Sequence, residues 1–160
     1  MAYIASAMYN YEKCLSVFSA KDPINYNRTI SNYICFLMRN GINERAKCRL
    51  LQIAKESKKI LDYNDPTYLY LNNNYGIYLM KYTDEDPSAY FLSIPFSTGT
   101  TETPYIYAQV NLALYYLKFE PILALRTLDN IEVIVLNSSV PRTKQFYVIN
   151  RALVEYANGI

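Results

Sequence analysis

The chain has no histidine among its 160 residues. Histidine is the most common general base and the most common zinc ligand, so its absence excludes every Ser-His and Cys-His nucleophile arrangement. Glycine is also scarce: the four glycines form neither a GxGxxG nor a GxxxxGK[ST] motif, so no phosphate-cradling loop is predicted. Most hydrolase mechanisms are therefore excluded, and we expect no nucleotide cofactor.

Paired cysteines, one-sided charge and long apolar runs are missing as well. Cys14, Cys35 and Cys48 lack CxxC spacing and lie in apolar or helical contexts, so we expect reduced thiols and a cytoplasmic protein. Sixteen basic and fourteen acidic residues leave a net charge of +2, far from the basicity of a surface that binds nucleic acid. No apolar run approaches the ~18 to 20 residues that span a bilayer. We therefore expect neither nucleic acid nor membrane as a partner.

The dense acidic cluster Asp84-Glu85-Asp86 is the one place where carboxylate chemistry comes into question. It is followed by Pro87, and proline suits the first turn of a helix because its missing N–H would be unpaired there. An acidic side chain just before the proline caps the free amides. We interpret the cluster as a helix start; acid–base or metal chemistry on Asp84 and Asp86 is the alternative. The prediction is no enzyme, no cofactor and no metal.

A degenerate four-residue pattern recurs along the chain. It consists of an Asn, usually an apolar residue, a small or apolar residue, and another apolar one. Its four copies are Asn32-Tyr33-Ile34-Cys35, Asn74-Tyr75-Gly76-Ile77, Asn111-Leu112-Ala113-Leu114 and Asn150-Arg151-Ala152-Leu153. The intervals of 42, 37 and 39 residues are typical of stacked helix pairs. The pattern therefore predicts an all-α repeat protein.

Prolines mark the helix starts of this repeat. Pro66, Pro87, Pro104 and Pro121 each follow a polar residue and precede an apolar helical pattern, and Pro141 is a looser case. Apolar residues at three- and four-residue steps predict an amphipathic helix from 44 to 61. The stretch 105–117 is apolar almost all round, which predicts a central helix. A polar loop is expected over 97–103.

Short motifs resemble the tetratricopeptide repeat superfamily, a 34-residue helix-turn-helix with W-x2-L-G-x2-Y, then A-x3-F, then P. Tyr11 to Phe18 resembles the start of the second helix of such a unit, with Cys14 in the place of the family's Ala. The next unit carries Gly41 at the turn and Ala46-x3-Leu50 behind it. The chain departs from the family by having no Trp, by intervals above 34 residues and by Pro95 in a short second helix. A related αα repeat of longer period stays open.

The resemblance implies an all-α, right-handed alpha-alpha superhelix (solenoid) of about four stacked helix-turn-helix repeats, forming a single domain over 1–160. Because 11–18 matches a second helix, residues 1–10 would belong to a first helix. Asn150 to Gly159 would be a first helix without its partner. Stacked repeats need polar caps over their last apolar face. We therefore expect a fragment of a longer protein, with a lone C-terminal capping helix as the alternative.

The resemblance also implies a binding groove lined by the first helix of each pair. The residues beside the Asn pattern would point into it. They are Arg28, Ser31, Cys35 and Arg39 in one unit, Tyr70, Asn73, Ile77 and Met80 in the next, and Tyr107, Val110, Leu114 and Leu117 in the third. Tyrosine suits protein interfaces, although the 18 tyrosines also fill helix–helix seams. The repeated Asn either bonds to a neighbouring helix or contacts the ligand.

The predicted function is a protein–protein interaction module that binds a peptide or protein partner in this groove. Another domain of its own parent chain is one candidate for this partner. The alternative function is a structural or sensory helical-repeat arm of a larger bacterial regulator or signalling ATPase. The carboxylate clamp of some relatives needs Lys and Asn at positions that Ser31 and Cys35 occupy here, so binding of acidic chaperone tails is not predicted.

Overall fold

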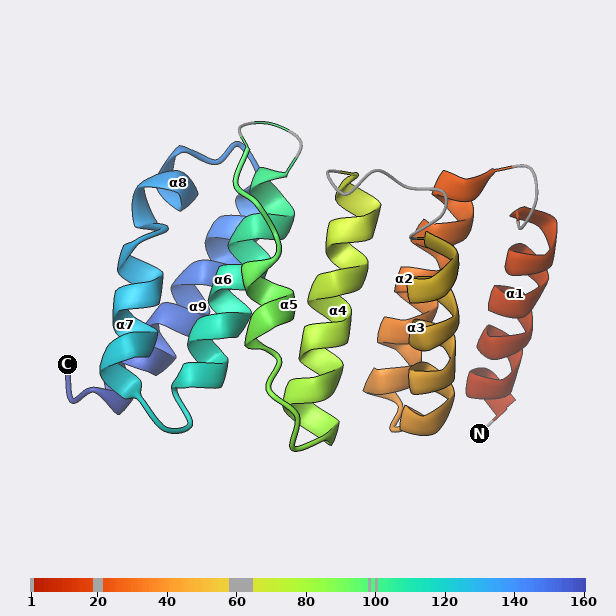
Figure 1. The fold of residues 1–160 in the computed structure, drawn as a ribbon, viewed down its shortest axis with the longest axis horizontal. Helices are drawn as coiled ribbons and strands as arrows, with labels where there is room; N and C mark the ends of the chain where they lie inside the picture. Colours follow the sequence, from red (N-terminus) through yellow and green to blue (C-terminus); the bar gives the residue numbers. More distant parts are fainter. Residues whose placement is uncertain (1, 19–21, 58–64, 98, 100) are drawn as a thin grey trace. The chain divides into compact units, whose positions relative to one another are not determined.

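The computed structural model describes residues 2–18, 22–57, 65–97, 99 and 101–160. Over these residues the chain is helical and contains no strand (Figure 1), which confirms the all-α prediction. The helices are α1 (Ala2–Phe18), α2 (Pro23–Arg39), α3 (Asn43–Ser57), α4 (Pro66–Tyr82), α5 (Ser88–Leu92), α6 (Glu102–Tyr116), α7 (Pro121–Asp129), α8 (Glu132–Asn137) and α9 (Pro141–Ala157). Among the described residues, no helix has both the length and the apolar character needed to cross a membrane.

Proline and acidic residues set the helix starts as predicted. Helices α4, α7 and α9 each begin at a proline. The Asp65 carboxylate accepts a hydrogen bond from the backbone N–H of Thr67 (2.7 Å), and Asp86 does the same for Ser88 (2.9 Å) at α5. This confirms the helix-start interpretation of the acidic cluster. Helix α6 begins at Glu102, two residues before Pro104, so the last two residues of the predicted loop are helical instead.

The predicted boundary at Tyr11 is wrong. Helix α1 runs without a turn from Ala2 to Phe18, so residues 2–10 do not form a separate first helix. No glycine or proline interrupts this stretch, and nothing in its local sequence would end a helix at Tyr11. The predicted helix over 44–61 is confirmed as far as Ser57; residues 58–61 lie outside the described residues.

The chain divides into two compact units, Met1–Asn74 and Tyr75–Ile160. The boundary falls within α4, whose first half belongs to one unit and whose second half belongs to the other. The single repeat domain that the sequence predicts over 1–160 stays a prediction.

In the first unit, α2 packs against both α1 and α3. The turn between α2 and α3 depends on Gly41, which adopts the left-handed conformation (φ 72°). The N–H of Ile42 bonds to the carbonyl of Leu37 (2.9 Å) and the N–H of Gly41 to that of Met38 (3.1 Å). These two bonds form a Schellman motif, which reverses the chain at the end of a helix. Gly41 therefore lies at a turn, as predicted.

The core of the first unit lies between these helices. Tyr33, Ile34 and Leu37 of α2 have no exposed surface, and Ala46 and Ile53 of α3 are buried against them in the same unit. The amphipathic pattern of α3 is therefore confirmed for the side chains that the structure describes: Ala46, Leu50 and Ile53 are buried, whereas Arg45 and Lys55 are exposed.

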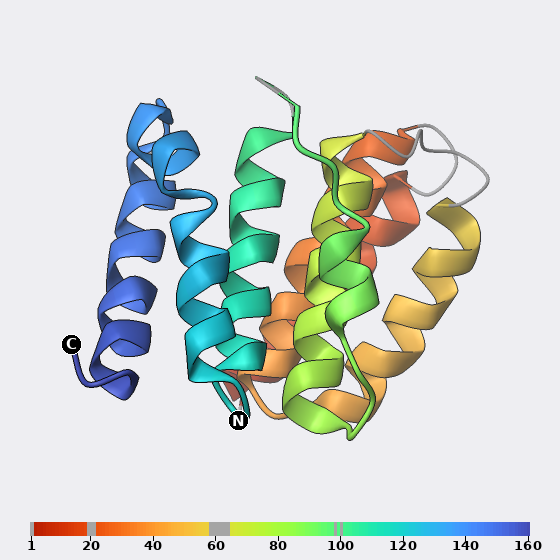
Figure 2. The same ribbon diagram turned by 60° about the vertical axis from the view of Figure 1, so that its left-hand side comes forward.

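In the second unit, α6 is the central helix. It contacts α5, α7, α8 and α9 (Figures 1 and 2). This confirms the prediction that its all-round apolar sequence belongs to an inner helix. The core residues are Ile106, Val110, Ala113, Ala124, Leu128, Ile131, Val135, Tyr147 and Val154.

An ionic cluster fixes α9 on the second unit. The guanidinium of Arg151 pairs with Asp129 (2.9 Å) and Glu155 (2.7 Å) and donates a hydrogen bond to the Tyr147 hydroxyl (2.6 Å). Asn158 donates to the carbonyl of Pro121 (3.0 Å) at the start of α7. These bonds set the rotation of α9 about its own axis, because they hold one side of the helix against α7.

Candidate functional site

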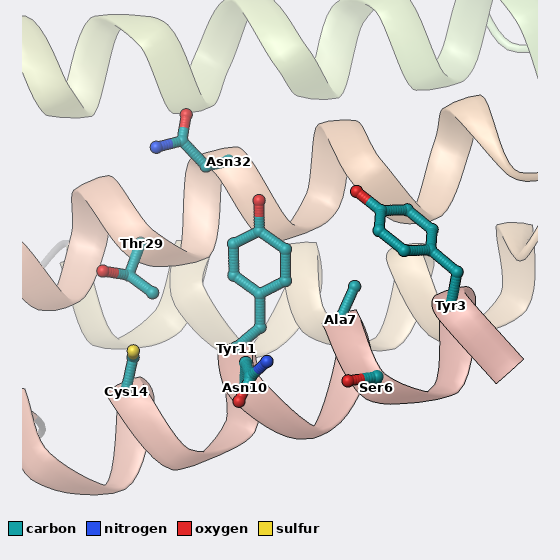
Figure 3. Close-up of a pocket in the computed structure, with 8 residues that line it drawn as sticks. All are labelled: Tyr3, Ser6, Ala7, Asn10, Tyr11, Cys14, Thr29 and Asn32. Atoms are coloured by element: carbon teal, nitrogen blue, oxygen red, sulfur yellow. The ribbon is translucent and has the colours of Figure 1, made fainter.

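A pocket of about 430 Å³ lies between α1 and α2 in the first unit (Figure 3). Six of its lining residues come from α1 and two from α2. They are Tyr3, Ser6, Ala7, Asn10, Tyr11, Cys14, Thr29 and Asn32. Positions 3, 7, 10 and 14 are spaced at four, three and four residues, so they share one face of a helix. The uninterrupted helix from Ala2 therefore creates this site.

Tyr11 forms the inner wall of the pocket. Figure 3 shows its ring rising from α1 toward α2. The ring stacks on Tyr33, with centroids 4.9 Å apart, and touches the ring of Phe36 at 5.6 Å. Because Tyr33 is fully buried, the Tyr11 ring rests on a fixed surface.

Glu12 holds α1 in place beside the pocket. Its carboxylate pairs with Arg45 (2.9 Å) and Arg49 of α3 and accepts a hydrogen bond from the Tyr33 hydroxyl (3.0 Å). Burial by itself would raise the pKa of Glu12, but the hydrogen bonds from Arg49, Arg45 and Tyr33 outweigh it, so the pKa lies below its ordinary value. The network links α1, α2 and α3 next to Tyr11, which lines the pocket.

The lining of the pocket is uncharged but rich in hydrogen-bonding groups. Asn10 and Asn32 are exposed, and each carboxamide offers both a donor and an acceptor, as a peptide group does. Tyr3 lies at one end of the pocket and is 80% exposed, so its ring offers an open aromatic face. The arrangement can hold an apolar side chain between the rings of Tyr3 and Tyr11 and bond to the backbone beside it.

The predicted binding residues of α2 adjoin the pocket. Arg28 and Arg39 are exposed, and with Asn32 they follow one side of the helix. Cys35 is half-buried, and burial raises the pKa of its thiol although Arg39 acts in the opposite direction. Ser31 accepts a hydrogen bond from the Asn74 side chain of α4 (2.7 Å), so its hydroxyl already has a protein partner.

Comparisons with known proteins give no relative. No protein-family model, curated protein or solved structure matches this chain. The role of the site is therefore inferred from the chemistry of its own residues.

The predicted residues of α4 lie on both sides of the unit boundary. In the first unit, Tyr70 is half-buried and Asn73 is buried. In the second unit, Ile77 and Met80 are half-buried, and the carbonyl of Met80 accepts a hydrogen bond from the Lys118 ammonium (2.8 Å). None of these four side chains lies at the α1–α2 pocket.

The predicted residues around α6 belong largely to the interior of the second unit. Val110 has no exposed surface and is part of the core, and Leu117 packs against that core. The ring of Tyr107 contacts the ring of Phe146 on α9, with centroids 4.9 Å apart. Leu114 is half-buried. A ligand on α6 would reach the edges of these side chains but not Val110.

The repeated asparagines occupy different environments. Asn32 is exposed at the pocket, whereas Asn74 and Asn111 are buried. The Asn74 amide bonds to Ser31 of a neighbouring helix, and the Asn150 amide bonds to the carbonyl of Phe146 in its own helix (2.6 Å). Asn74 and Asn150 therefore have structural bonds, and Asn32 is the member of the set that is placed to contact a ligand.

None of the eight lining residues is among the predicted binding residues, and only Asn32, through the repeated Asn pattern, was considered as a ligand contact. The signal was present, because the seven-residue repeat of positions 3 and 10 and of 7 and 14 marks one face of a helix. It was overlooked because the match of Tyr11 to a repeat motif placed a helix boundary in the middle of that pattern.

Proposed function

We propose that this chain is a protein-interaction module that binds a peptide or protein partner in the α1–α2 pocket and along the adjoining side of α2. The observation that carries the proposal is the pocket itself. It combines a fixed aromatic wall at Tyr11, an open ring at Tyr3 and the exposed carboxamide of Asn32. Aromatic side chains with a polar tip are favoured at protein interfaces.

The charges beside the pocket specify the ligand further. The eight lining residues carry no charge, so the segment that enters is uncharged and bears an apolar or aromatic side chain. Arg28 and Arg39 flank this position on α2, and within the described residues neither forms an ion pair. We therefore expect the ligand to carry an acidic residue next to its apolar anchor.

The wider architecture that we propose is a tetratricopeptide-like right-handed solenoid of about four helix pairs. Two pairs of successive helices support it, α2 with α3 and α6 with α7. In each pair a small residue of the second helix, Ala46 or Ala124, is fully buried. Small residues let paired helices approach closely. Small-angle scattering at low concentration tests this: an extended solenoid should exceed the about 15 Å radius of gyration of a compact 160-residue domain, and about 15 Å would contradict it.

Selection from a displayed library of random 12-residue peptides tests the binding function. The wild-type chain should enrich peptides that carry an aromatic or aliphatic residue beside Asp or Glu. The affinity of an enriched peptide should fall at least about tenfold for Tyr3→Ala and for Asn32→Ala, which corresponds to the loss of about 1.4 kcal/mol.

Tyr9→Ala is the matched control, because Tyr9 is exposed on the same helix but does not line the pocket. It should leave the peptide affinity unchanged. Arg28→Glu should lower the affinity for acidic peptides more than the affinity for neutral ones. If the folded wild-type chain enriches no peptide, or if the enriched peptides bind Tyr3→Ala and Tyr9→Ala equally well, the pocket is not a binding site.

A further inference from the structure

Helix α9 exposes an apolar stripe on the second unit, far along the chain from the α1–α2 pocket. Ile149 is 70% exposed and Tyr156 is 82% exposed. All residues of the α9 stripe are exposed: Arg142, Gln145, Val148, Ile149, Ala152, Leu153 and Tyr156. Large apolar side chains that lie together on a surface mark an interaction site more often than scattered ones.

The stripe cannot turn toward the interior. The opposite side of α9 carries Tyr147 and Val154, which belong to the core of the second unit. Arg151 is tied to Asp129 and Glu132 as well as to Glu155 in its own helix. Because rotation of α9 would expose the core residues and break these ion pairs, the stripe stays on the surface.

The spacing of the stripe is that of a coiled-coil seam. Positions 142, 145, 149, 152 and 156 are separated by three, four, three and four residues. Ile149, Ala152 and Tyr156 place apolar residues at three successive a and d positions of a helix pair, and the polar Arg142 and Gln145 occupy the two positions before them. Val148 and Leu153 flank the seam and widen its apolar surface. The natural occupant of the stripe is therefore another helix.

We propose that the occupant is α9 of a second copy of this chain, packed antiparallel about a two-fold axis between residues 150 and 151. In this register the bulky Ile149 faces the partner's Ala152, while the two Val148 side chains lie along one flank of the seam and the two Leu153 side chains along the other. Large side chains then meet small ones, which lets the two helices approach closely. The same patch serves both copies, as a two-fold interface requires.

Charge decides the direction of the two helices. In an antiparallel pair, Arg142 lies beside the partner's last helical turn, where the backbone carbonyls carry partial negative charge and the partner's Tyr156 offers an aromatic face. In a parallel pair, Arg142 would instead face the partner's Arg142, and the two positive charges would repel. A single helix from each copy buries less than the ~800 Å² per partner of a standard interface, so the dimer is weak and dissociates on dilution.

Sedimentation equilibrium tests the dimer. The wild-type chain should change from monomer to dimer as the concentration rises from about 10 to about 500 µM, the range expected of a weak complex. Ile149→Asp should remain monomeric throughout. Val133→Asp is the matched control, because Val133 is a β-branched residue on α8 that is 69% exposed and lies outside the stripe. It should dimerise as the wild type does.

Single-cysteine variants test the direction. In a background with Cys14→Ser, Cys35→Ala and Cys48→Ser, Ala152→Cys should form a disulfide-linked dimer, because the two 152 positions lie about 4.5 Å apart along the axis. Arg142→Cys should not, because its two copies lie about 25 Å apart. A wild-type chain that stays monomeric, or an Ile149→Asp variant that still dimerises, would overturn the proposal. Efficient linkage at position 142 would overturn the antiparallel arrangement.

Discussion

A methyl group added at Gly76 should collide with the ring of Phe91 in the second unit. A Cβ atom at position 76 of α4 would lie 2.6 Å from Cε1 of Phe91 and 2.8 Å from its Cζ. Phe91 is fully buried on α5, so its ring has no solvent side to move into. Gly76→Ala therefore forces either the ring or the two helices apart.

The change in the free energy of unfolding caused by Gly76→Ala is the balance of two opposing effects. Replacing glycine by alanine within a helix stabilises it by about 1 kcal/mol. Inserting a methyl group into a well-packed core costs about 1 to 3 kcal/mol. We expect Gly76→Ala to lower the free energy of unfolding by a net amount of about 1 kcal/mol.

A double-mutant cycle in urea separates the two effects. Phe91→Leu alone should cost about 1 to 2 kcal/mol through the loss of buried ring surface. In the presence of Phe91→Leu the methyl group has room, so Gly76→Ala should now stabilise the chain by about 1 kcal/mol. The coupling energy between the two changes should then be about 2 kcal/mol, with opposite signs for Gly76→Ala in the two backgrounds.

Gly41→Ala is the control. Gly41 has no atom within 4 Å of an added Cβ, but its φ of 72° is unfavourable for alanine. This change should therefore destabilise by about 1 to 2 kcal/mol through backbone strain, and Phe91→Leu should not rescue it. If Gly76→Ala stabilises the otherwise unchanged chain, the close packing of α4 on α5 is refuted.

Three further results are expected. Because hydrogen bonds lower the pKa of Glu12 in the folded protein, the ionised carboxylate stabilises the fold above the unfolded pKa of about 4.3, and this contribution is lost as the pH falls through the lower folded pKa. Urea denaturation of the wild type should therefore show stability falling between about pH 5 and 3, and Glu12→Gln should make this fall smaller. Arg151→Met should cost about 1 to 3 kcal/mol, because it removes three ion pairs and the hydrogen bond to Tyr147; an unchanged melting temperature would contradict this. Cys35 should react with a thiol reagent at pH 8 at least about tenfold more slowly than the exposed Cys14, and equal rates would show that it is not shielded.

Helix starts and helix faces could be read from the sequence because local chemistry decides them. A proline fits the first turn whatever the rest of the fold does, and the acidic residue before it caps the free amides. Pro66, Pro121 and Pro141 therefore marked their helices correctly. Gly41 was also identified, because a sharp reversal after a helix requires the left-handed conformation that glycine adopts readily.

The one wrong boundary shows the limit of motif matching. Tyr11 to Phe18 fits a repeat motif, but no residue before Tyr11 would break a helix, and α1 continues through it. Local helix propensity therefore prevailed over the register of a degenerate pattern. The pocket that depends on this longer helix could not be found once the boundary had been misplaced.

The sequence by itself determined that the chain is helical, where most helices begin, and that α6 is a central helix. Only the tertiary structure decided which asparagine bonds to a neighbouring helix and which faces solvent, that Val110 lies in the core, and that Tyr3 and Asn32 meet at one pocket. The physical reason is the distance along the sequence over which the deciding interactions act. A cap or a turn is formed by residues a few positions apart, whereas exposure is set by helices that lie tens of residues away and pack through side chains whose contacts no local pattern records.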